Sequence, residues 1–61
     1  MNAPDRLAVF LDRVRQVGAF RAGKSWRLYE QFKGDLDRDF PGLSPEQRDA
    51  AIRVIAEAAG V

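Results

Sequence analysis

Residues 18–25, with the sequence GAFRAGKS, match the pattern GxxxxGK[ST] of phosphate-binding loops. In nucleotide hydrolases the backbone N–H groups of this loop surround the phosphates, the lysine reaches the outer phosphates, and the hydroxyl holds magnesium. That chemistry needs a buried parallel strand before the loop and a larger α/β domain, whereas residues 8–17 have the spacing of an amphipathic helix. We therefore interpret the segment as an interhelical loop in which Ser25 caps the next helix.

The basic side chains around this loop could still bind an anion. A helix N-terminus offers free N–H groups and a positive dipole end, and an exposed tryptophan can stack on a nucleic-acid base. Residues 1–33 carry seven basic and three acidic side chains, whereas residues 34–61 carry three basic and six acidic ones. The predicted anion or nucleic-acid site consists of Arg13, Arg21, Lys24, Trp26 and Arg27.

Four acidic residues follow the spacing of an EF-hand calcium loop. Asp35, Asp37, Asp39 and Glu46 occupy the first, third, fifth and twelfth positions of that pattern. The sixth position, which needs glycine for a sharp bend, is Phe40, and Glu46 is already explained as part of a helix start. We therefore predict no metal and no cofactor, with calcium at the four acids as the alternative. The competing interpretation is a polar helix end that is partly neutralised by Arg38 or by the basic first half of the chain.

The composition argues against catalysis. The 61-residue chain has no cysteine and no histidine, which excludes a thiol nucleophile, an imidazole base, a disulfide framework and a zinc-finger site. No spacing brings two carboxylates into an evident buried pair, and a chain this short buries one small core. We expect a protein that is not an enzyme.

Apolar residues recur at helical spacing in three segments, about 3–17, 26–39 and 45–59. The short connections predict an all-α, compact three-helix bundle that forms a single small domain over residues 1–61. Asn2 is the predicted cap of the first segment and Gly18 its predicted end. The sequence Ser-Pro-Glu-Gln at residues 44–47 predicts a capping box, and Gly60 should end the third helix.

Six aromatic residues accompany these helices. At helical spacing in a small chain, Tyr29, Phe32 and Phe40 are expected to form part of the core, whereas Phe20 and Trp26 lie at its margins and could be exposed. An exposed Trp26 beside Arg27 would be a good anchor for a partner.

The third segment has an unusually wide apolar face, which covers about half of the helix where one core contact needs roughly 100°. This helix should touch either two helices of its own chain or one of them and a second chain. The predicted partner interface consists of Ala51, Val54, Ala58 and Trp26. The favoured function is a non-enzymatic binding module that acts through protein contacts or homodimerisation. The alternative is a small nucleic-acid-binding accessory protein that uses the basic patch.

The location is predicted from the absence of targeting patterns. Residues 1–5 lack a basic region followed by an apolar run, and no apolar stretch approaches the roughly 18–20 residues of a membrane span. We expect a cytoplasmic protein with no membrane partner.

Overall fold

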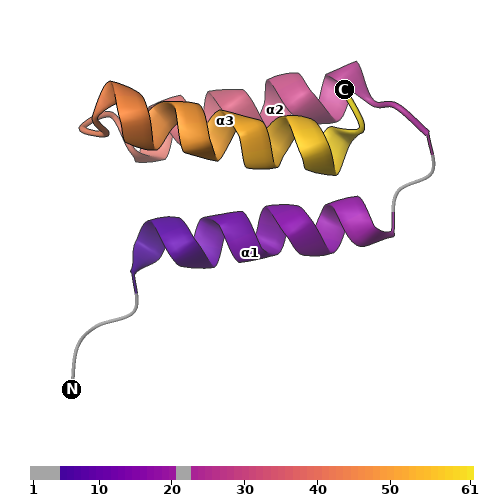
Figure 1. Cartoon of the computed structure of the whole chain (residues 1–61), viewed down its shortest axis with the longest axis horizontal. Coiled ribbons are helices and arrows are strands. Elements are labelled where there is room, and N and C mark those ends of the chain that lie inside the picture. Colours follow the sequence, from indigo (N-terminus) through magenta and orange to yellow (C-terminus); the bar gives the residue numbers. More distant parts are fainter. Residues whose placement is uncertain (1–4, 21–22) are drawn as a thin grey trace.

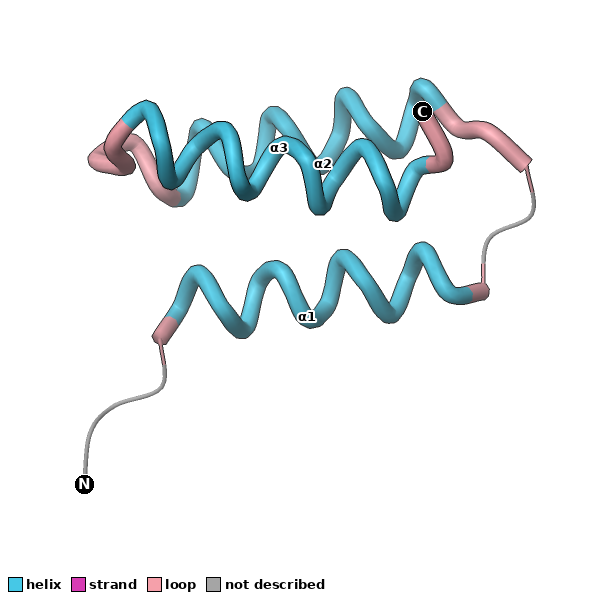
Figure 2. The backbone as a smooth tube through the Cα atoms, viewed as in Figure 1, coloured by secondary structure: helices cyan, strands magenta, loops and turns pink. Residues whose placement is uncertain are grey.

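The computed structural model describes residues 5–20 and 23–61. Within these ranges the chain forms three helices, α1 (Arg6–Ala19), α2 (Trp26–Asp39) and α3 (Pro45–Ala59), and no strand. The helices run up, down and up, and α1 and α2 each pack against α3 (Figures 1 and 2). The predicted all-α three-helix bundle is confirmed. None of the described helices is long and apolar enough to cross a membrane.

The starts of α2 and α3 are those expected from the sequence. The Ser25 hydroxyl accepts a hydrogen bond from the Leu28 N–H at 3.2 Å and begins α2. At the start of α3, the Ser44 hydroxyl accepts from the Gln47 N–H at 3.1 Å, and the Gln47 side chain accepts from the Ser44 N–H at 3.0 Å. This reciprocal pair is the predicted capping box. Gly60 ends α3 with a φ of 76°, a conformation that glycine adopts without a steric penalty.

Both predicted ends of α1 need correction. The Asp5 carboxylate accepts from the Leu7 N–H at 3.0 Å, so the helix begins at Arg6 rather than near residue 3, and Asn2 lies outside the described residues. The prediction that Gly18 ends the helix is wrong, because α1 continues to Ala19. A Cβ at position 18 would lie 2.7 Å from the Cα of Ala58, so the missing side chain allows α1 and α3 to approach closely.

The core is supplied mostly by α3. Among the described residues the buried ones are all apolar: Val14 from α1, Leu36 from α2, and Ala51, Ile55, Ala58 and Ala59 from α3. Neighbours on two sides of α3 explain why its apolar arc is wider than one contact requires. Of the two interpretations of that arc, the structure therefore shows contact with two helices of the same chain.

The aromatic residues divide into two groups. Phe10, Tyr29, Phe32 and Phe40 are half-buried and pack against the core. Phe20 is 92% exposed and Trp26 is 63% exposed, and both lie at the end of the bundle where α1 ends and α2 begins (Figure 1).

Candidate partner-binding groove

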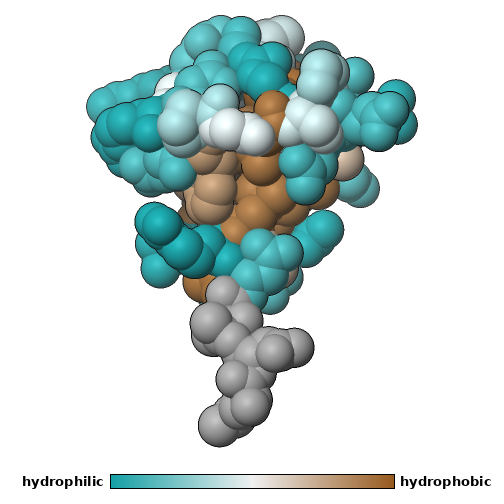
Figure 3. Space-filling model, turned by 90° about the vertical axis from the view of Figure 1, so that its left-hand side faces the viewer, coloured by the Kyte–Doolittle hydropathy of each residue, from teal (hydrophilic) through white to brown (hydrophobic). Residues whose placement is uncertain are grey.

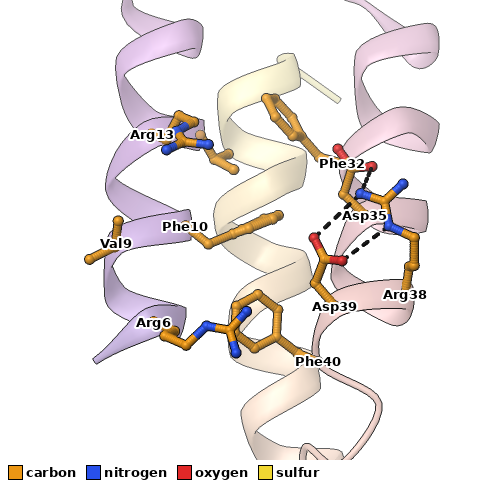
Figure 4. Close-up of a pocket in the computed structure, with 10 residues that line it drawn as sticks. Arg6, Val9, Phe10, Arg13, Phe32, Asp35, Arg38, Asp39 and Phe40 are labelled. Carbon is orange, nitrogen blue, oxygen red and sulfur yellow. Dashed lines mark hydrogen bonds and ion pairs between the residues drawn. The ribbon is translucent and has the colours of Figure 1, made fainter. Parts of the chain in front are cut away.

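A groove of about 580 Å³ lies between α1 and α2. In Figure 4, Arg6 and Phe10 of α1 extend towards α2 and its C-cap, Val9 points away from them, and α3 lies between and behind the two helices. Its lining is apolar at the centre and charged at both edges: Arg6, Val9, Phe10, Arg13 and Val14 from α1, with Phe32, Asp35, Arg38, Asp39 and Phe40 from α2 and its C-cap. The groove exists because α1 and α2 both pack closely on α3 and only weakly on each other.

Three phenylalanine rings form the floor of the groove. The Phe10 ring meets the Phe32 ring edge to face at a centroid distance of 6.1 Å, and the Phe40 ring at 5.6 Å. Phe32 and Phe40 lie four residues before and after the buried Leu36, so one row of side chains contributes both the core contact and the floor. On α1, Phe10 lies one turn before the buried Val14 in the same way.

The edge of the groove on α2 carries one arginine paired with two carboxylates, so its charges are partly neutralised. The Arg38 guanidinium lies 3.2 Å from the Asp35 carboxylate and 3.0 Å from that of Asp39. The hydrogen bond from Arg38 holds the pKa of Asp39 below its ordinary value, and the positive charge of Arg6 acts in the same direction. The edge on α1 is different, because it carries only the two arginines, Arg6 and Arg13.

The predicted anion site is not gathered around the groove. Arg13 lines it, whereas Lys24 and Arg27 are exposed and do not, and Arg21 lies outside the described residues. The exposed Trp26 ring contacts the Tyr29 ring edge to face at 5.7 Å. The predicted basic patch is therefore divided between the edge of the groove and the first turn of α2.

The predicted partner interface on α3 lies largely inside the molecule. Ala51 and Ala58 are buried, which removes them from the surface that a partner can reach while the bundle is closed. Val54 is half-buried and lines, with Ala58 and Gly18, a second hollow of about 270 Å³ between α1 and α3. This hollow has an edge formed by Arg15, which lies on the other side of α1 from Arg13.

The four acidic residues of the EF-hand spacing do not come together. Arg48 of α3 donates two hydrogen bonds to the Asp37 carboxylate, at 3.0 and 3.1 Å. Arg38 forms ion pairs with both Asp35 and Asp39. The hydrogen bond from Arg48 lowers the pKa of Asp37. The described residues include Glu46, and among them no three His, Cys, Asp or Glu side chains are grouped so that they could hold a metal ion. The polar helix end is partly neutralised by arginines, as the competing interpretation predicted for Arg38.

This groove was not among the sites predicted from the sequence. Arg6, Phe10 and Arg13 are helical neighbours at spacings of four and seven, but Phe10 was predicted as part of an apolar stripe, Arg13 as part of the basic patch, and Arg6 as part of neither. A repeat of basic residues directly beside an apolar stripe is the pattern that could have indicated an edge. Whether a groove stays open beside this edge depends on how α2 packs, and the residue pattern of α1 cannot predict that packing.

No protein-family model, curated protein or solved structure matches this chain, so the fold and the geometry of the groove are the basis for proposing a function.

Proposed function

We propose that this protein is a non-enzymatic binding module whose groove between α1 and α2 receives the apolar face of a helix from a partner protein. The observation that carries the proposal is the floor of three phenylalanine rings between two charged edges. Apolar surface that reaches the outside between polar edges is typical of sites that bind other proteins. Apolar surface is also visible between the helices in the end-on view of Figure 3.

The shape of the groove favours a helix over a compact small molecule. From Arg6 to Arg13 it follows α1 for about two turns, roughly 10 Å, with helices on both sides. A helix laid along it would complete a four-helix arrangement and bury its apolar stripe against the phenylalanine floor.

The charges support binding rather than proton transfer. Asp39, which lines the groove, has a lowered pKa because Arg38 donates a hydrogen bond to it. A carboxyl group that acts as a general acid near neutral pH needs the opposite shift. The chain has no histidine and no cysteine, which also argues against proton transfer or nucleophilic catalysis.

The chain's own four phenylalanines provide the test. Biosynthetic labelling with 4-fluorophenylalanine places a ¹⁹F probe on the three rings of the groove and a control probe on Phe20, which is exposed at the end of the bundle. A helix-stabilised peptide with leucines at i, i+3, i+4 and i+7 and neutral glutamine flanks should shift the three groove resonances and leave Phe20 unchanged. A scrambled peptide of the same composition is the matched control.

Two results would contradict the proposal. If the scrambled peptide shifts the same resonances equally, the groove takes apolar side chains without recognising a helix. If Phe20 responds and the groove rings do not, the binding surface is the end of the bundle.

Nucleic-acid binding is the second candidate, favoured by the exposed Trp26 beside the exposed Lys24 and Arg27. A labelled DNA duplex should then bind at about 50 mM salt and lose most of its affinity at about 200 mM, because phosphate binding releases counterions. The variant Trp26→Ala should weaken binding of single strands, on which the ring can stack. Absence of binding at both salt concentrations excludes this candidate.

A further inference from the structure

The two edges of the groove differ in charge, and this difference defines its occupant more narrowly. On α2, the single positive charge of Arg38 is taken up by two carboxylates, which leaves that edge with a net charge of −1. On α1, the edge carries two arginines and no acid, a net charge of +2. An occupant of the groove therefore meets a basic edge on one flank and a weakly acidic edge on the other.

The two arginines of α1 are not equally available. The Arg6 guanidinium lies over the Phe40 ring, 5.9 Å from its centroid, and its charge also acts on Asp39. Arg13 forms no hydrogen bond or ion pair with any residue in the described ranges, and its side chain is exposed. The free cation beside the phenylalanine floor is therefore Arg13.

The spacing of the two arginines matches the period of a helix. Seven residues separate them, which is nearly two turns, so both lie on one side of α1 and about 10 Å apart along its axis. A second helix aligned with α1 has the same rise per residue. Two carboxylates seven positions apart on its flank would come opposite both arginines at once.

We infer that the groove binds an amphipathic helix whose apolar stripe is bordered on the α1 side by acidic residues at i and i+7, with neutral or basic residues on the α2 side. This inference rests on the proposed function and specifies the chemistry of its partner. Charge complementarity at the edges of an interface selects the partner and its orientation, while the apolar floor supplies most of the binding energy.

Two labelled, helix-stabilised peptides of about 18 residues test the inference. Both carry the same leucine stripe, and one has glutamates and the other lysines at i and i+7 of one flank. Fluorescence anisotropy with the full-length chain at about 50 mM salt should give at least about fivefold tighter binding of the glutamate peptide, since two exposed ion pairs are exchanged for two repulsions. The preference should shrink at about 200 mM salt because the edges are exposed.

The variants Arg13→Glu and Arg15→Glu form a matched pair. Both replace an exposed arginine on α1 by glutamate, but Arg13 lines the groove and Arg15 lies on the other side of the helix. Arg13→Glu lowers the net charge of the α1 edge from +2 to 0 and should remove most of the preference between the two peptides, whereas Arg15→Glu should keep its direction and most of its size. Circular dichroism and urea unfolding of both variants exclude an effect through loss of the fold.

Several outcomes would overturn the inference. Equal binding of the two peptides, with the ¹⁹F shifts of the groove rings still present, leaves the helix-binding groove in place and refutes the acidic edge. Equal effects of the two substitutions mean that only the total charge matters. No binding of either peptide refutes the inference, and if the neutral peptide also fails, it refutes the proposed function too.

A concentration-dependent dimer in sedimentation equilibrium that is lost in Arg13→Glu identifies a second copy of the chain as the occupant. Competition by a DNA duplex that needs Arg13 assigns this edge to phosphate.

Discussion

Helix α1 packs closely against α3 and loosely against α2. Towards α3, a glycine faces an alanine so closely that no further carbon fits, because a Cβ on Gly18 would lie 2.7 Å from the Ala58 Cα. Towards α2, large rings keep the helices apart and leave a groove of about 580 Å³. Small residues bring the backbones of one interface into close contact, with only a hollow of about 270 Å³ beside it, whereas phenylalanines fill the other interface only in part. The close contact with α3 holds α1 in the bundle, and the side towards α2 is the one at which we propose that a partner binds.

The largest effect is expected from Gly18→Ala, on the side of α1 that faces α3. The added methyl group meets backbone atoms of Ala58, which cannot rotate away, so α1 must shift from α3. Overpacking of this kind costs about 1–3 kcal/mol, a large share of the few kcal/mol available to a chain of this size. Urea unfolding followed by circular dichroism measures the loss.

The matched control is Gly34→Ala within α2, where an added Cβ meets nothing within 4 Å. This substitution should stabilise the protein by about 0.5–1 kcal/mol through helix propensity alone. If both substitutions change stability in the same direction, the close approach of α1 and α3 does not limit the packing.

An intermediate effect is expected from Phe10→Leu in the groove. The smaller side chain loses edge-to-face contacts with Phe32 and Phe40 and removes part of the floor. Each such aromatic pair contributes about 0.5–1.5 kcal/mol, so urea unfolding should show a loss of about 1–2 kcal/mol. The bundle should stay folded and peptide binding should weaken. A loss of stability as large as that of Gly18→Ala would mean that the groove is part of the closed core.

The smallest effect is expected at the ion pair that joins α2 to α3, between Asp37 and Arg48. Its hydrogen bond lowers the folded-state pKa of Asp37, so the contribution to stability is fully present above the unfolded-state pKa, near 3.8, and is lost as the pH falls through the lower folded-state value. Asp37→Asn should therefore lower stability slightly at neutral pH and leave it unchanged near pH 2, which flattens the acidic part of the stability curve. Urea unfolding from about pH 2 to about pH 7 measures this, and Arg48→Gln should give the same flattening. A curve in Asp37→Asn that keeps the acid loss of the parent chain assigns that loss to other carboxylates.

Local patterns in the sequence were sufficient to predict most of the elements. Ser25 and Ser44 begin helices because a hydroxyl can satisfy N–H groups within its own next turn, and this requires only neighbours in the chain. The same local reasoning misplaced the end of α1. Glycine commonly ends a helix, but Gly18 lies within α1 and allows the backbone of Ala58 to come close. Ala58 is forty residues away in the sequence, so a local pattern could not predict this contact.

The residues of the candidate sites also divide into those predicted by local patterns and those placed only by the tertiary structure. The sequence by itself determined the number and type of the elements, their capping, the lack of histidine and cysteine, and the wide apolar face of α3, because each is a property of composition or of helical period. The tertiary structure decided that Ala51 and Ala58 lie inside, that Arg38 and Arg48 hold the acids of the EF-hand spacing, and that Arg13 borders a groove. The groove is a space between two helices, and its width depends on how both pack against the third.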